Sequence, residues 1–308
     1  MKRTFLRALE SLPRILLLVC ALTAAHAALA EAFTPEPGSD VKKGILLVAF
    51  GSSMPEGEEG INAVTDVVKA AYPGVEVRVS YTSRIIMRKI ARERNKTVDE
   101  PAIALAKMAY EGFTDVTVVS THVIPGAEYD DLKSVVDGFR LMSGGGPKAG
   151  FRRISLSLPL LSNLRDFERL AQALTDTYSE RGRNGAVIFV GHGTHHFADA
   201  AYSALQMALW RKSPNFYVGT IEGMPSYDDV LARIKASKVK NALIAPAMLV
   251  AGDHAHNDIA GDEEDSWKSM LTAEGFRVTP VLSGLGQNKA VQSLILDKLR
   301  EAWDEGAM

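Results

Sequence analysis

The chain has 308 residues, of which 46% are hydrophobic and 23% are charged, and its formal net charge is −2 at pH 7. This length and hydrophobic content exclude a disordered chain and predict a globular protein with enough core for two domains. Nucleic-acid binding is not expected, because no basic run with interleaved aromatic residues follows residue 30.

Residues 1–30 have the pattern of a secretory signal peptide. A basic leader surrounds the start of the apolar run ILLLVCALTAA, and ALA at 28–30 is a small-x-small cleavage site. The run is too short to span a bilayer as a stable helix. We therefore expect a periplasmic protein that leaves the membrane after cleavage. The single cysteine, Cys20, lies in this leader, so the exported part can form neither a disulfide nor a thiolate metal site.

Short apolar runs alternate with stretches of helical period in the first half of the chain. The runs at 44–50, 75–81, 115–121 and 151–157 are rich in β-branched residues and predict strands. Thr97 and Glu100 form a capping-box pair and predict a helix start. This alternation predicts a parallel α/β domain over residues 42–158.

The same alternation repeats in the second half and predicts a second α/β domain over residues 159–286. Its strands are expected at 186–191, 215–223, 241–252 and 276–284, and KAVQSLILDKLREAW predicts a last helix. In both halves the first strand ends in Gly and small or polar residues. A histidine follows the third strand, at His122 and His254. These matches hint at an internal duplication.

Polar residues follow three strands of the second half: His192 after the first, Glu222 after the second and His254 after the third. Ligands of parallel α/β sheets bind beyond the carboxyl ends of the strands. Two imidazoles and a carboxylate suit cobalt, nickel, iron or zinc, and three protein ligands leave a coordination position open. The sequence therefore predicts a metal site here. The alternative is that each histidine caps a helix or bonds a backbone carbonyl.

The remaining histidines of this region are weaker candidates. His195 and His196 are expected in the first turn of a helix that starts near Thr194, where their side chains diverge by about 100°. At most one of them can then face the site. His256 is expected to support the ligands or to lie in an exposed loop. The acidic run GDEEDSWKSM lacks the ligand spacing of a calcium loop and predicts a solvated helix N-terminus.

Three residues of the first half are candidates for binding substrate carboxylates. Ser52 and Ser53 follow the first predicted strand, and Arg84 lies in the segment TSR. The alternatives are that the two serines cap the next helix and that Arg84 forms a surface ion pair.

Several longer motifs, in their order and spacing, resemble one known family. They are YTSRIIMRKI and THVIPGAEYDDL in the first half, and GHGTHH, PAMLVAGDHAHND, DSWK and LSGLGQN in the second. The chain from about residue 42 onward resembles the anaerobic sirohydrochlorin cobaltochelatases of the cobalamin pathway, in the class II chelatase superfamily. The resemblance implies an α/β fold of two Rossmann-like domains whose parallel sheets face a central tetrapyrrole cleft. It also implies that helix 287–304 packs back on the first domain.

The resemblance implies a reaction as well: insertion of Co²⁺, with Fe²⁺ as the alternative ion, into sirohydrochlorin without nucleotide hydrolysis. It implies that His192, Glu222 and His254 bind the metal. Imidazole exchanges metals and protons near neutral pH, since its reference pKa is about 6.5. The two histidines are therefore predicted to deliver the metal and accept pyrrole protons, with Glu222 as ligand or proton relay. Export is a departure from the family, whose pathway is cytoplasmic.

Export also leaves a non-enzyme open, namely a periplasmic protein that binds or transports haem or a metal. His122 could then be an axial ligand of a haem iron. A partly exposed haem favours burial by a second subunit, so a homo-oligomer is possible. A third alternative is a zinc hydrolase, because HAHND approaches the H-x-H-x-D-H pattern. Ile259 replaces the final histidine of that pattern, and the α/β alternation is wrong for that fold.

Overall fold

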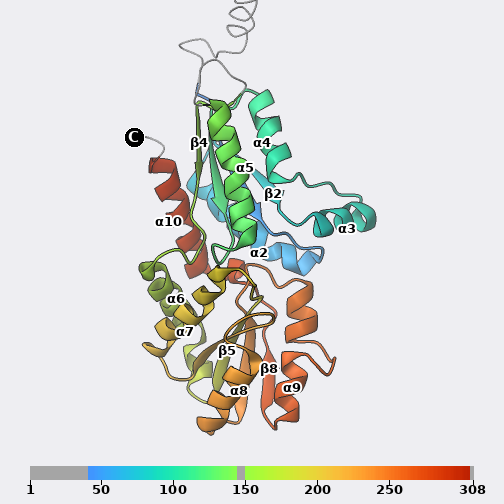
Figure 1. Ribbon diagram of the computed structural model, residues 1–308, viewed down its shortest axis with the longest axis vertical. Helices are drawn as coiled ribbons and strands as arrows, with labels where there is room; N and C mark the ends of the chain where they lie inside the picture. Colours follow the sequence, from blue (N-terminus) through green and yellow to red (C-terminus); the bar gives the residue numbers. More distant parts are fainter. Residues whose placement is uncertain (1–40, 144–149, 306–308) are drawn as a thin grey trace, which may run out of the picture.

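The computed structural model describes residues 41–143 and 150–305 and has two α/β lobes stacked along its long axis (Figure 1). The expected signal peptide lies outside the described residues. Within the described part of the chain, no helix is long and apolar enough to cross a membrane.

The first lobe is built on a parallel sheet with the strand order β2-β1-β3-β4. Its two central strands are almost completely buried, which explains why both are rich in apolar and β-branched residues. The strands are β1 (Lys43–Ala49), β2 (Glu76–Tyr81), β3 (Asp115–Ser120) and β4 (Arg153–Leu156). The helices are α2 (Pro55–Ala71), α3 (Arg84–Arg94), α4 (Pro101–Tyr110) and α5 (Ala127–Ser143).

The second lobe repeats this topology, with the parallel strand order β6-β5-β7-β8. Its strands are β5 (Ala186–Gly191), β6 (Phe216–Thr220), β7 (Asn241–Pro246) and β8 (Arg277–Pro280). Its helices are α6 (Leu164–Gly182), α7 (Ala200–Trp210), α8 (Tyr227–Ala236) and α9 (Trp267–Ala273), and α10 (Lys289–Glu305) follows. The predicted fold of two parallel α/β units is confirmed.

Two predicted helix starts are wrong. Helix α4 begins at Pro101, and its N-cap is Glu100 without a side-chain cap. Proline suits the first helical position but disfavours helical backbone in the residue before it, so the helix cannot start at Thr97. The helix expected near Thr194 begins instead with a 3₁₀ turn, Phe197–Asp199. His196 is its N-cap and accepts a hydrogen bond from Ala198 N–H through Nδ1 at 3.2 Å.

Helix α10 joins the two lobes. It contacts α2, β3 and β4 of the first lobe and α6 of the second, and Figure 1 shows it beside the first sheet. One hydrophobic cluster includes Leu47 of β1, Leu174 of α6, Phe189 of β5 and Leu299 of α10. The core is therefore continuous between the lobes.

Candidate metal site

The imidazoles of His192 and His254 lie against each other, with ring centroids 4.5 Å apart and planes at 87°. His192 follows β5, and His254 lies beyond β7, the neighbouring strand of the sheet. The parallel topology places both residues at the carboxyl edge of the second sheet, as the sequence pattern predicted. Two of the three predicted ligands are therefore neighbours.

Hydrogen bonds at Nδ1 fix the tautomer of both rings. His192 Nδ1 lies 2.9 Å from Gly193 O, and His254 Nδ1 lies 2.5 Å from Asp258 Oδ2. A carbonyl oxygen and an ionised carboxylate can only accept, so Nδ1 carries the proton in each ring. In the neutral form of each imidazole the lone pair is then on Nε2, the atom that would bind a metal. Metal-binding histidines are commonly oriented in this way.

A tight turn brings the loop after β5 close to the loop after β6. Gly193 has φ +82°, and a Cβ on it would lie 2.5 Å from Gly223 N, so only glycine fits here. Glu222 N–H donates to His192 O at 2.8 Å. The backbones of His192 and Glu222 are therefore directly coupled, although the Glu222 residue is exposed.

Asp199 holds the same two loops together from the start of α7. Its Oδ1 accepts from Thr194 N–H at 3.1 Å, and its Oδ2 accepts from Met224 N–H at 2.8 Å. Tyr202 lies under the first loop, and burial raises its pKa to about 12 while the backbone amides of Gly193 and His192 oppose the rise. This phenol is therefore protonated at neutral pH, and its ring supports the turn.

Within residues 41–143 and 150–305, no three His, Cys, Asp or Glu side chains are grouped as a preformed metal site. The histidine pair and the backbone of Glu222 are in place. His254 is the N-cap of a π-helix, Ala255–Ile259, which places Asp258 one turn after His254. Single π-helical turns are rare and frequent at functional sites.

The other predicted histidines lie outside this pair. His195 is exposed, and His196 caps the 3₁₀ turn and lies 3.3 Å from Asp130 of α5 in the first lobe. His256 has a buried Nε2 without a hydrogen-bond partner among the described residues.

The first-lobe candidates each have a partner in the structure. Ser52 is buried, and its hydroxyl bonds to the backbone N and O of Met54, at the start of α2. Ser53 Oγ donates to Asp253 Oδ2 in the second lobe at 3.0 Å. Arg84 pairs with Glu100 at 2.8 Å, and 71% of its side chain is exposed.

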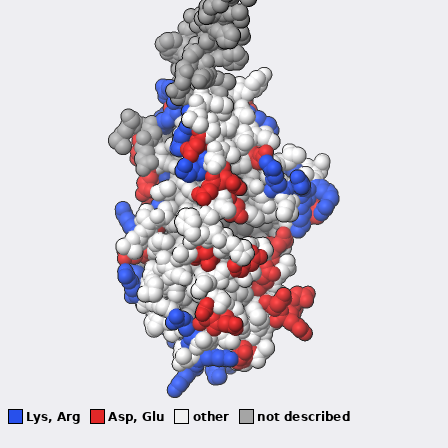
Figure 2. Space-filling model, viewed as in Figure 1, with Lys and Arg blue, Asp and Glu red and all other residues white. Residues whose placement is uncertain are grey.

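The carboxyl edges of the two sheets face each other. Ser53, beyond β1, contacts Asp253, beyond β7, and Asp130, at the start of α5, lies near His196, beyond β5. Figure 2 shows a hollow at the waist between the lobes, with Lys and Arg side chains gathered over α3 and Asp and Glu side chains below them. The histidine pair therefore lies on the side of its sheet that faces the first lobe.

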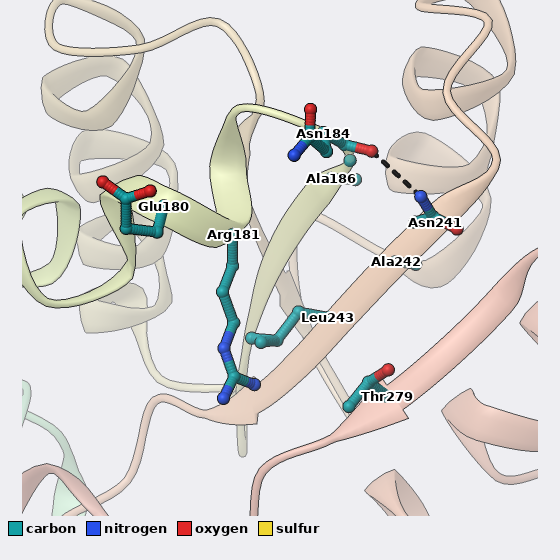
Figure 3. A pocket seen from close by; sticks show the side chains of 9 residues that line it. Glu180, Arg181, Asn184, Ala186, Asn241, Ala242, Leu243 and Thr279 are labelled. Carbon is teal, nitrogen blue, oxygen red and sulfur yellow. Dashed lines mark hydrogen bonds between the residues drawn. The ribbon is translucent and has the colours of Figure 1, made fainter.

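A separate cavity of about 290 Å³ lies at the opposite edge of the second sheet (Figure 3). Its lining includes Arg181, Ala186, Leu243 and Thr279, where β5 and β7 begin. None of the predicted site residues lines it.

His122 follows β3 in the first lobe and is shielded from solvent at its ring. Its Nδ1 lies 2.9 Å from Ser120 Oγ, and its Nε2 is buried without a hydrogen-bond partner in the described part of the chain. Burial lowers the pKa of His122 to about 4, and the charge of Glu128 opposes this shift only in part. The ring is therefore neutral at physiological pH.

This shift predicts acid sensitivity of the fold. Below about pH 6.5 the unfolded chain binds a proton at His122, whereas the folded protein does not until about pH 4. The contribution of His122 to the free energy of unfolding should therefore be fully present above pH 6.5 and decrease by on the order of 3 kcal/mol as the pH drops to 4. Urea unfolding at pH 7 and pH 4.5 measures this, and His122→Gln should reduce the difference. An equal loss of stability in the variant would contradict the assignment.

Comparison with known proteins gives the family of this chain. The model of the family described as "Cobalt chelatase (CbiK)" matches residues 43–304. The chain belongs to the cobalt chelatase family. Members of this family that are similar to it include a sirohydrochlorin cobaltochelatase, CbiKC, of Nitratidesulfovibrio vulgaris, 40% identical over 85% of this chain and 90% of that protein. Another is the sirohydrochlorin cobaltochelatase of Salmonella typhimurium, 35% identical over 85% of this chain and 97% of that protein.

The fold also matches that of solved chelatases. SirB from Bacillus subtilis, in a structure with Fe³⁺, has a TM-score of 0.59 and 14% identity, and the match covers 87% of this chain and 98% of that one. The zinc-hydrolase alternative suggested by HAHND does not fit this family or this parallel α/β fold.

Sequence reasoning missed three acidic residues of this chelatase-family protein. Asp258 lies within HAHND, and its spacing of four from His254 was a readable signal. Asp253 precedes His254 directly, but its contacts with the other lobe are not visible in the sequence. No pattern in the sequence indicates a role for Asp199, because its carboxylate acts by accepting a hydrogen bond from the loop after β6, and the path of that loop cannot be read from the sequence.

Proposed function

We propose that this protein inserts Co²⁺ into sirohydrochlorin, with Fe²⁺ as the alternative ion. Family membership and the two sirohydrochlorin cobaltochelatases support the substrate and the reaction. The observation that carries the proposal is the perpendicular pair of histidine rings, in which both Nδ1 atoms donate hydrogen bonds. The pair presents two Nε2 lone pairs at the edge of the sheet that faces the other lobe.

The proposed reaction exchanges a metal ion for protons. His192 and His254 hold Co²⁺ through Nε2, and Glu222 completes the site or relays protons. When the ring nitrogens take the ion, two pyrrole N–H protons leave, and the two freed Nε2 atoms are bases for them. Asp258 stabilises the imidazolium that forms at His254. The exchange balances in charge and protons, and we propose that it proceeds without nucleotide hydrolysis.

Anaerobic incubation of the purified protein with sirohydrochlorin and either Co²⁺ or Fe²⁺ tests this function. Absorption spectra should show conversion of the free tetrapyrrole to its metal complex under multiple turnover. Stoichiometric binding of tetrapyrrole without conversion would contradict the proposal.

Asp199 joins the loop after β5 to the loop after β6, and this connection supplies a prediction about metal affinity. In Asp199→Asn an amide NH₂ replaces one acceptor oxygen and faces a backbone N–H, so one of the two loops is released. Changes to residues that position ligands cost about 10- to 100-fold in metal affinity. We expect this loss for Co²⁺, measured by competition with a fluorescent chelator. Asp228→Asn, an exposed change on α8, is the matched control. Equal affinities for Co²⁺ in both variants would refute the role of Asp199 in positioning the two loops.

We propose that the protein acts in the periplasm, supported by the basic leader, the short apolar run and the ALA site of residues 1–30. Mass spectrometry of protein from the native host should find a chain that starts near Ala28 or Glu31 in the periplasmic fraction. An intact Met1 terminus in the cytosol would refute this.

A second candidate function is haem binding at His122. It is supported by the unpartnered Nε2, which is kept neutral by burial as an axial ligand must be. Because Nε2 is shielded in the described structure, its cover must open or give way to the haem, and a second subunit could complete the burial. Protein from haem-replete cells should show a Soret band that His122→Ala removes. Wild-type protein without a Soret band would reject this function.

A further inference from the structure

The carboxylate of Asp253 reaches from the second lobe into a polar site of the first. Its Oδ2 accepts a hydrogen bond from Ser53 Oγ at 3.0 Å and lies 3.4 Å from Lys89 Nζ of α3. A hydroxyl and an ammonium group are common partners of a bound carboxylate. Ser53 is buried, with 8% exposure, so the hydroxyl lies in the floor of this site.

The contact of Asp253 with Ser53 and Lys89 is exposed enough for a ligand to replace Asp253. The side chain of Asp253 is 45% exposed and that of Lys89 is 38% exposed. Ion pairs with this exposure contribute little to stability, so a carboxylate from a bound ligand can replace Asp253 at small cost.

The surroundings favour an anionic ligand. Arg88 and Arg92 of α3 are also exposed, Arg92 in an ion pair with Glu93 at 2.8 Å, and Figure 2 shows Lys and Arg side chains gathered over α3 beside the hollow between the lobes. Such a field raises the local concentration of anions. Ile85 lies one turn before Lys89 on the same face of the helix and is 79% exposed, so it offers an apolar surface next to the cations.

We propose that Ser53 and Lys89 form a subsite for one carboxylate of the tetrapyrrole substrate, and that Asp253 occupies it while the cleft is empty. The inference rests on the proposed function, because it assumes a ring with carboxylates on its rim. His254 is the residue next to Asp253. Substrate that displaces Asp253 therefore frees the chain segment that carries a proposed metal ligand.

Binding of uroporphyrin, a stable porphyrin whose rim carries carboxylates, tests the subsite without turnover. The dissociation constant is measured by quenching of porphyrin fluorescence for the wild type, Asp253→Ala, Asp253→Asn, Lys89→Met and the double variant Asp253→Ala/Lys89→Met. Glu56→Gln is the matched control, because it removes one negative charge from the exposed first turn of α2, close in sequence to Ser53. Thermal unfolding of each variant checks the fold.

The two single changes should shift affinity in opposite directions. Loss of the internal competitor should lower the dissociation constant of Asp253→Ala roughly threefold, and Lys89→Met should raise it by a similar factor. Asp253→Asn should bind at least as tightly as the wild type. In the double variant, which lacks Lys89, the gain in affinity caused by Asp253→Ala should be no larger than the gain caused by Glu56→Gln.

If Asp253 only fastens the lobes together, Asp253→Ala and Lys89→Met should both weaken binding, and that result would overturn the subsite. A gain in Asp253→Ala no larger than that of Glu56→Gln, or one that persists without Lys89, would overturn it too. Wild-type protein that does not bind uroporphyrin would also overturn the subsite, whereas the proposed function is tested separately by conversion of sirohydrochlorin to its metal complex.

Discussion

His192→Ala and His254→Ala should each lower the rate of cobalt insertion by about a hundredfold or more, because changes to residues that only orient metal ligands already cost about 10- to 100-fold. Each change removes an Nε2 that holds the ion and later accepts a pyrrole proton. Neither side chain belongs to the buried core, so the melting temperature should change little. Initial rates of metal insertion, followed by absorption, measure the effect.

His195→Ala is the matched control for this experiment. It removes an exposed imidazole from the same loop, outside the perpendicular pair. Its insertion rate should equal that of the wild type. Near-normal rates in both His192→Ala and His254→Ala would show that the pair does not handle the metal.

Asp166→Ala should lower the free energy of unfolding by about 3–5 kcal/mol, the range for removing one partner of a buried ion pair. Lys298 of α10 is 5% exposed, and its Nζ lies 2.7 Å from Asp166 Oδ2. The next carboxylate, that of Glu301, is 3.9 Å away, so the variant leaves an ammonium group poorly compensated. The change also breaks the capping box of α6, in which Asp166 bonds Asn163 N–H.

Arg169→Met tests the same pair of helices at an exposed position. Arg169 of α6 pairs with Asp297 of α10, and both side chains are about one-third exposed. Exposed pairs contribute at most about 1 kcal/mol, so this variant should unfold close to the wild type. Equal losses in Asp166→Ala and Arg169→Met, measured by urea unfolding, would contradict the importance of the buried pair.

The sequence was sufficient to predict the order of the strands and the proximity of His192 and His254, although the predicted strands at 215–223, 241–252 and 276–284 extend past the ends of β6, β7 and β8. The central strands β1, β3, β5 and β7 are short, mostly buried segments rich in apolar and β-branched residues. Because parallel strands end at a common edge, the sequence alone predicts that His192 and His254 lie close together.

The contacts that organise the site could not be predicted in the same way. Asp199 and Asp253 act through loops that are distant in the sequence, and no periodicity records such contacts. The start of α4 was mispredicted, because the capping pair at Thr97 was considered without the constraint that Pro101 places on Glu100. The sequence predicts that Ser53 binds substrate carboxylates, whereas in the structure its hydroxyl donates to a carboxylate of the protein itself.

The position of α10 has a consequence for how the protein is made. This helix packs on β3 and β4, but it contains the final described residues of the chain, Lys289–Glu305. Until this helix packs, the first lobe leaves apolar surface beside β3 and β4 exposed to water. A chain that lacks the segment from residue 289 onward should therefore expose this surface and be prone to aggregation and proteolysis.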